Sequence, residues 1–161
     1  MTKSEFYDLV MAAYRPTEKM ISMVPPDKLT WRPGPTFMSV GQVLCHLGTG
    51  MGEEFGMLLT GKWPSMAEME QAMKLENMPS CGIQEALDKL AKDKTTLRTV
   101  LDGIPEADFA ARIVSVPWGW EGKLEIMAIN FLGHTLHHKM QLFTYLKLLG
   151  LPVNTETLYG G

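Results

Sequence analysis

Residues 127–150 read MAINFLGHTLHHKMQLFTYLKLLG, a stretch in which apolar side chains recur at intervals of three and four residues. That spacing is typical of one face of an amphipathic α-helix. The members of the predicted face are Met127, Phe131, His134, His138, Leu142, Tyr145 and Leu149. Gly150 and Pro152 predict the end of the helix. Because two histidines interrupt an otherwise apolar face, we expect both imidazoles to point into the protein interior.

Three more helices are predicted, over residues 2–24, 39–61 and 83–103. Thr2 with Glu5, and Ser39 with Gln42, have the spacing of a capping box, in which two side chains satisfy free backbone N–H groups at a helix start. Few residues in the sequence indicate β-strands. The predicted fold class is therefore all-α: a four-helix bundle with long connections between helices 1 and 2, 2 and 3, and 3 and 4.

The connections themselves carry weak local signals. Residues 62–82 are long enough to cross the bundle and could hold a helical turn near residues 66–74. Residues 112–120 favour a short extended segment with a turn. A chain of 161 residues can bury a real core, so residues 1–161 are predicted to form a single domain.

The second predicted helix contains four glycines, Gly48, Gly50, Gly52 and Gly56. Each costs up to ~1 kcal/mol relative to alanine inside a helix. Such a cost indicates that the backbone must approach something closely. A neighbouring helix and a bound ligand are both consistent with the pattern.

Bulk composition restricts the function classes. The net charge is -3 and the basic residues are scattered, so the sequence predicts no nucleic-acid partner. No stretch approaches the ~18 apolar residues of a membrane span, and we expect a cytoplasmic protein that does not contact membranes. Cys45 and Cys81 make no disulfide framework, and both are predicted to be reduced thiols.

The histidines have the spacing of a metal site. His134 and His138 lie one helical turn apart on one face, and a histidine from a facing helix would complete a three-nitrogen set. His46, inside the second predicted helix, is the candidate for that third position. The alternative is a pair of hydrogen-bonded core histidines, or surface residues on a helix of different phase. His137 points about 100° away from His138 and is assigned to the flank of the site.

Other polar residues near these positions have two interpretations each. Gln141 could orient a metal ligand, although an ordinary interhelical hydrogen bond is the simpler reading. Glu53 or Glu54 could supply a fourth ligand or a proton acceptor, and a solvated helix face explains them equally well. Cys45 is adjacent to His46 and is not counted as a ligand.

Aromatic and sulfur-containing residues could shape a pocket. The tryptophans, Trp31, Trp63, Trp118 and Trp120, all fall in connections, where they would cover either a pocket mouth or the ends of the bundle. The chain also has 13 methionines, which suit an adaptable apolar pocket but equally serve as core filling.

Two regions of the sequence resemble the DinB/YfiT-like family of metal-dependent enzymes. Residues 29–33, LTWRP, and 39–47, SVGQVLCHL, look like the family's "W-R-P … S-I-G … H-L" entry into its second helix. Residues 134–150 resemble its "H-x-x-H-H-R-G-Q … Y-L-R-L-L-G" helix. Lys139 and Met140 stand where the family usually has Arg and Gly.

The resemblance implies a four-helix bundle of unusual helix order that often forms a dimer. It also implies a divalent metal held by His46, His134 and His138. Some relatives transfer low-molecular-weight thiols such as bacillithiol, mycothiol or glutathione, and others are thiol-dependent isomerases. We accordingly expect a small-molecule substrate, a thiol as co-substrate, and a homodimer.

The leading hypothesis from the sequence is a metal-dependent enzyme that activates a thiol or water, as a thiol S-transferase or a hydrolase. The alternative is a non-catalytic, stress-related bundle that binds metal or a small ligand, and a third reading is a structural bundle without metal. Zn or Ni is the favoured ion, with Fe and Mn as further candidates. The sequence assigns no catalytic residue beyond the three metal ligands.

Overall fold

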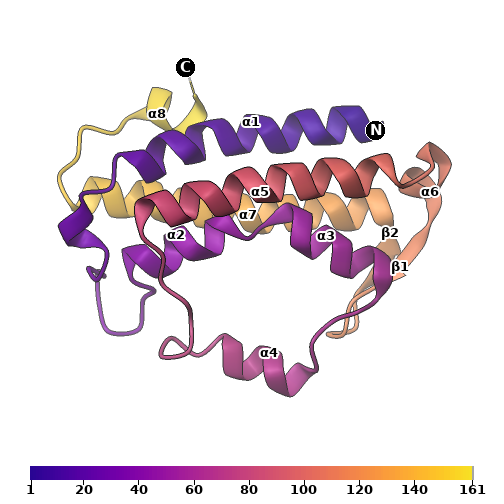
Figure 1. Cartoon of the computed structure of the whole chain (residues 1–161), viewed down its shortest axis with the longest axis horizontal. Coiled ribbons are helices and arrows are strands. Elements are labelled where there is room, and N and C mark those ends of the chain that lie inside the picture. Colours follow the sequence, from indigo (N-terminus) through magenta and orange to yellow (C-terminus); the bar gives the residue numbers. More distant parts are fainter. Residues whose placement is uncertain (161) are drawn as a thin grey trace.

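Three long helices run alongside one another in the computed structural model, which describes residues 1–160 (Figure 1). They are α1 (Lys3–Ser22), α5 (Ile83–Asp102) and α7 (Leu124–Leu148). Two shorter helices, α2 (Val40–Gly48) and α3 (Met51–Thr60), follow each other along the same direction. The remaining elements are η1 (Pro26–Lys28), α4 (Met66–Ala72), α6 (Glu106–Ala111), β1 (Ile113–Ser115), β2 (Glu121–Lys123) and α8 (Thr155–Tyr159). The predicted all-α class is correct, with one small two-stranded sheet added.

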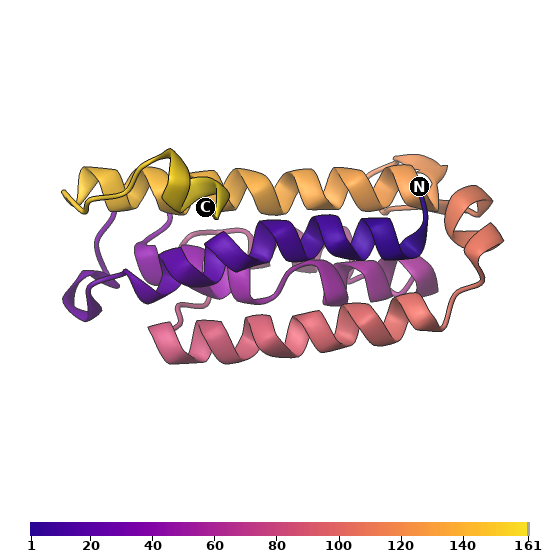
Figure 2. The ribbon, with the colours of Figure 1, turned by 90° about the horizontal axis from the view of Figure 1, so that it is seen from above.

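The long helices enclose the core. Helix α1 packs against both α5 and α7, and the α2–α3 pair also packs against both. Seen from above, α5 and α7 lie on opposite sides of the protein with α1 between them (Figure 2). The largest fully buried side chains are aromatic: Phe6, Tyr14, Phe55 and Phe109. Three of their rings form a cluster with centroids 5.6–6.3 Å apart. No helix within residues 1–160 is both long enough and apolar enough to cross a membrane.

The two predicted capping boxes are present. The hydroxyls of Thr2 and Ser39 accept hydrogen bonds from the backbone N–H groups of Glu5 and Gln42, at 3.1 and 3.2 Å. The side chains of Glu5 and Gln42 accept in return from the cap backbone at 2.7 and 2.8 Å. These bonds fix where α1 and α2 begin and therefore set the phase of every later residue on each helix.

The predicted helix over residues 39–61 is not continuous, because the chain breaks between α2 and α3 at Thr49 and Gly50. A Cβ on Gly50 would lie 2.9 Å from the Tyr14 hydroxyl of α1. A Cβ on Gly52 would lie 2.6 Å from the Asp93 carbonyl oxygen of α5. These glycines therefore serve close helix packing, which decides between the two readings left open by the sequence. Gly56 has no atom within 4 Å of its would-be Cβ.

Polar groups of α1 and α5 hold the start of α3 in place. The Met51 N–H donates to the Tyr14 hydroxyl at 3.0 Å, and the Gly52 N–H donates to the Asp93 carboxylate at 2.9 Å. Tyr14 donates in turn to Asp93 at 2.7 Å. A buried carboxylate thus takes the role that a capping side chain would otherwise have at this helix start.

The extended segment predicted near residues 112–120 is strand β1, and it pairs antiparallel with β2, with Val114 opposite Gly122. Gly119 turns the chain at a φ of 89°, a conformation that favours glycine. Because residues 121–123 pair with β1, the last long helix begins only at Leu124.

The prediction that both cysteines are reduced thiols is wrong in this structure, which joins Cys45 and Cys81 in a disulfide. Their Cα atoms are 4.8 Å apart, and the Cys81 N–H donates to the Gly41 carbonyl at 3.0 Å. The connection containing α4 leaves the end of α3 and comes back beside α2 before α5 begins (Figure 1). Nothing in the local sequence indicates this return.

Candidate metal centre

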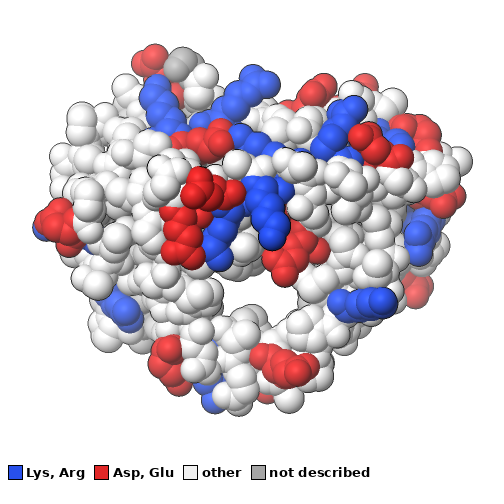
Figure 3. Space-filling view, in the orientation of Figure 1, with Lys and Arg blue, Asp and Glu red and all other residues white. Residues whose placement is uncertain are grey.

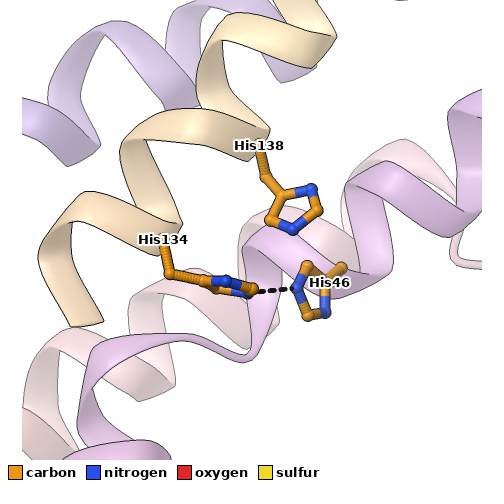
Figure 4. A group of neighbouring side chains, drawn as sticks. All are labelled: His46, His134 and His138. Atoms are coloured by element: carbon orange, nitrogen blue, oxygen red, sulfur yellow. Dashed lines mark hydrogen bonds between the residues drawn. The ribbon is translucent and has the colours of Figure 1, made fainter. Parts of the chain in front are cut away.

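Three of the four histidines converge at the contact between α2 and α7 (Figure 4). His46 comes from α2, and His134 and His138 come from successive turns of α7. One nitrogen of each ring lies within 4.8 Å of the other two, and the Nε2 atoms of His46 and His134 are 2.9 Å apart. The structure therefore brings together the three residues that the sequence singled out. His137 lies outside this group and is exposed.

Burial at the cluster differs from the prediction in one respect. His46 and His138 are partly buried, but His134 is exposed at the edge of the cluster. The apolar periodicity of the sequence predicted that both His134 and His138 face inward. The helix instead turns His134 toward an open cavity, which leaves one side of the cluster accessible.

Hydrogen bonding fixes the tautomer of His138. Its Nδ1 lies 2.8 Å from the Gln141 Oε1, and because a carbonyl oxygen can only accept, Nδ1 carries the proton. Gln141 Nε2 donates to the Tyr145 hydroxyl at 3.0 Å, which donates to the Met38 carbonyl at 3.1 Å. The Nε2 lone pair of His138 is thus directed to the cluster. Gln141 orients this histidine, the reading that the sequence made secondary to a plain interhelical bond.

The protonation of the cluster favours binding of a cation. Burial, followed by the proximity of His138 and His134, lowers the pKa of His46 to about 4. Burial also lowers the pKa values of His134 and His138. All three imidazoles are therefore neutral near pH 7, the form in which histidine binds metals.

The two neighbouring glutamates lie on different sides of α3. Glu53 borders a polar pocket on the α5 side, together with Lys89 and Lys92. Glu54 borders the small space between the histidines, and its Oε2 is buried without a hydrogen-bond partner among residues 1–160. Burial, and then the charges of Asp93 and Glu53, raise the pKa of Glu54 to about 8. Of the two candidates from the sequence, only Glu54 lies at the cluster.

Two cavities flank the cluster. One, of about 270 Å³, is lined by Trp118, Trp120 and Phe131 and reaches His134; we call it the tryptophan cavity. The other, of about 240 Å³, lies between α2 and the α4 connection and is lined by Met38, Met73, Met78 and His46. The opening between α2 and α4 is visible in the space-filling view (Figure 3). Trp118 and Trp120 thus line one pocket and three methionines line the other, whereas Met20 and Met51 fill the core.

These residues fit a divalent cation. The donors are three neutral imidazoles, a set that suits Zn, Ni, Cu and Fe. Among the described residues lining the two cavities and the space between the histidines, none is lysine or arginine, so no fixed positive charge opposes a cation. Cys45 is held in the disulfide and is not available as a ligand.

Comparison with known proteins identifies the family. The DinB superfamily model matches residues 11–142. A DinB family protein from Exiguobacterium sibiricum superposes with a TM-score of 0.72 at 22% identity, covering 96% of both chains. A DinB-like protein from Bacillus cereus gives a TM-score of 0.72 at 18% identity over 95% of this chain and 96% of the other. A DinB-like protein from Bacillus subtilis gives a TM-score of 0.67 at 16% identity, over 92% of this chain and 96% of the other. No curated protein matches the sequence. The match over residues 11–142 places this chain in the DinB superfamily.

Proposed function

We propose that this protein is a metal-dependent enzyme that uses His46, His134 and His138 to hold a divalent cation and activates a thiol or water for attack on a small organic electrophile. The observation that carries the proposal is the convergence of three neutral imidazoles from α2 and α7 within 4.8 Å. Family membership supports it, because the resemblance to DinB-like proteins implies the same three ligands and the superfamily model matches residues 11–142.

The chemistry follows from the charge of the ligands. His46, His134 and His138 would hold the cation without neutralising its charge, and the cation would then lower the pKa of a thiol or water beside it. The protein groups have supporting tasks. Gln141 holds His138 in one tautomer, and burial keeps His46 free of a proton at neutral pH. The flanking cavities give a small substrate access from two sides.

Thiol transfer and hydrolysis differ in their need for a base. A thiol loses its proton readily near a cation, whereas hydrolysis benefits from a separate proton acceptor. Glu54 is the carboxyl group that lines the cluster. With its pKa raised to about 8 in the metal-free protein, it could accept a proton only at higher pH or after a bound cation had lowered that pKa. The proposal therefore includes S-transfer from a low-molecular-weight thiol and hydrolysis as its two reaction classes, with Zn or Ni as the favoured ion and Fe or Mn after them.

Metal analysis tests the site first. The protein, purified without added metal and then loaded separately with Zn, Ni, Fe or Mn, is expected to bind one equivalent. His138→Ala and His46→Ala should lose that equivalent and keep their helix content in circular dichroism, because core contacts maintain the fold. His137→Ala is the matched control and should bind as the parent does. Stoichiometric metal in His138→Ala would refute the ligand assignment.

A substrate panel tests turnover. The loaded protein is assayed with bacillithiol, glutathione or cysteine against 1-chloro-2,4-dinitrobenzene, and with phenyl esters and amides in the absence of thiol. Thiol-dependent or thiol-independent turnover that disappears in His138→Ala is the expected result. Full metal loading without turnover across the panel would favour the alternative, a binding protein that holds metal or a small ligand.

The architecture and assembly complete the proposal. We infer that α1, α5, α7 and the broken α2–α3 pair form one four-helix bundle and one domain, supported by the packing of α1 and α2–α3 against both α5 and α7. A homodimer and a cytoplasmic location remain predictions. Light scattering of the purified protein tests the first, and fractionation of cells tests the second.

A further inference from the structure

The tryptophan cavity has an ordered aromatic wall. Trp63 and Phe131 are stacked with centroids 6.0 Å apart, and the Trp118 ring meets both edge-on, at 5.4 and 6.5 Å. Trp120 continues the row, 6.5 Å from Trp118. The backbone also fixes the hairpin tip that carries Trp118 and Trp120, because the Val116 N–H donates to the Trp120 carbonyl at 3.0 Å. The wall is therefore shaped before any ligand arrives.

Much of this aromatic surface faces solvent. Trp118 is 39% exposed and Trp120 is 59% exposed. Large exposed aromatic surface is unfavourable in water and marks a place where another apolar group packs. A cavity of about 270 Å³ is too small for a protein segment and has room for a small molecule.

The charges of the cavity narrow the choice of ligand. Glu54 and His134 are the only ionisable side chains among the described residues that line it, and both also line the space between the histidines, which we call the inner end of the cavity. A ligand carboxylate or phosphate would meet no lysine or arginine there that could pair with its charge. An anionic ligand is accordingly disfavoured in the metal-free protein.

Glu54 supplies the polar contact. Its Oε2 is buried and has no hydrogen-bond partner among residues 1–160, which is costly unless a ligand or ion completes it. Asn130 also lines the cavity and offers both a donor and an acceptor. A ligand with an amide or ketone group could therefore satisfy the inner end of the cavity while its ring lies along the tryptophans.

We propose that the tryptophan cavity binds a planar, uncharged aromatic molecule whose polar substituent contacts Glu54 beside His134. This inference deepens the proposed function. It rests on that function in one respect: the bound molecule is taken to be the substrate of the three-histidine site. Recognition comes from the face of the ring against Trp118 and Trp120, and orientation comes from Glu54. The orientation places the substituent of the ring, rather than the ring itself, next to the histidines.

Binding of four simple probes to metal-free protein tests the proposal without any turnover. Benzamide, benzoate, cyclohexanecarboxamide and toluene are titrated while the indole N–H signals of Trp118 and Trp120 are followed by NMR. Benzamide should bind ~5-fold more tightly than cyclohexanecarboxamide, since only a planar ring stacks well. It should bind ~10-fold more tightly than benzoate, which carries an unpaired charge. Benzoate binding as tightly as benzamide, or no shift of either indole signal, would overturn the proposal.

Variants separate the two parts of the site. Trp120→Leu should weaken the binding of benzamide ~5-fold. Phe37→Leu, which alters another half-exposed aromatic residue outside the cavity, should leave the affinity for benzamide unchanged. Glu54→Leu should remove the preference for benzamide over toluene while keeping toluene binding. An unaltered preference in Glu54→Leu would contradict the role of Glu54, and an unaltered affinity in Trp120→Leu would contradict the aromatic wall.

The metal experiment stays independent of this one. Benzamide binding in a protein that takes up no metal would refute the proposed metal enzyme and support the aromatic site. Stoichiometric metal without benzamide binding would refute the aromatic site and leave the metal centre supported.

Discussion

The Nδ1–H of His138 donates to Oε1 of Gln141, one turn further along α7, over 2.8 Å. The bond orients a histidine from within its own helix. It also extends through Tyr145 to the Met38 backbone next to the start of α2. The position of His138 is therefore coupled to the helix that carries His46, and the two sides of the cluster are held by one hydrogen-bonded chain.

Gln141→Leu should weaken metal binding by about 10–100-fold, the usual effect of removing the partner that orients a metal-bound histidine. Gln141→Glu should preserve or strengthen binding, since a carboxylate accepts the same proton and adds negative charge. Competition with a chromophoric chelator measures both affinities. Gln84→Leu, on the exposed face of α5, is the control, and equal affinities in Gln141→Leu and Gln84→Leu would show that the hydrogen bond has no role in binding.

Tyr14→Phe should destabilise the protein by about 1–3 kcal/mol, because it leaves the Met51 N–H without a buried partner and removes one of the hydrogen bonds to the Asp93 carboxylate. Burial, and then the nearby Asp93 charge, raise the pKa of Tyr14, so the hydroxyl keeps its proton as donor. Urea unfolding monitored by circular dichroism measures the change. Tyr7→Phe, on the same helix, is the matched control; an equal loss in both variants would mean that the hydroxyl of Tyr14 contributes nothing specific.

Local sequence patterns predict much of the fold and of the three-histidine cluster. The capping boxes at Thr2 and Ser39 place two helix starts, and the apolar periodicity of residues 127–149 predicts the longest helix. His134 and His138 follow from helical spacing alone, because residues four apart must share a face. Pairing His46 with them needed only the expectation that two amphipathic helices pack together.

What the sequence could not supply depends on contacts between distant residues. The break between α2 and α3 at Gly50 is stabilised by Asp93, 43 positions further along the chain, and no local sequence pattern predicts it. The break resets the phase of the following helix, which is why Glu53 and Glu54 could not be told apart beforehand. The pairing of Cys45 with Cys81 depends in the same way on how the α4 connection returns to α2.

Reduction of the Cys45–Cys81 disulfide should cost about 2–4 kcal/mol of stability, since the bond closes a loop between residues 36 positions apart and limits the unfolded chain. Thermal unfolding with and without a phosphine reductant measures the loss. Cys81→Ser should unfold at the same temperature in both conditions. Two free thiols in the native, untreated protein, counted by alkylation and mass spectrometry, would contradict the bond.

Glu54→Gln should change how stability depends on pH. The folded protein raises the pKa of Glu54 from 4.5 to about 8, so between these values the folded state holds a proton that the unfolded state releases. The stability contributed by this proton is complete below pH 4.5 and is lost as the pH rises through 8. Metal-free parent protein should therefore lose stability from pH 5 to pH 8.5 relative to Glu54→Gln, which has no such proton.

The comparison is made by thermal unfolding of metal-free parent, Glu54→Gln and Glu53→Gln at both pH values. Because every other titrating group is common to the three proteins, the difference between two variants isolates the mutated carboxyl group. Glu53→Gln should keep most of the parent's pH dependence, since the Glu53 charge is the smallest of the three causes that raise the pKa of Glu54. Parallel pH profiles for the parent and Glu54→Gln would mean that Glu54 ionises as an ordinary surface glutamate, and its buried oxygen would then have found a partner in water.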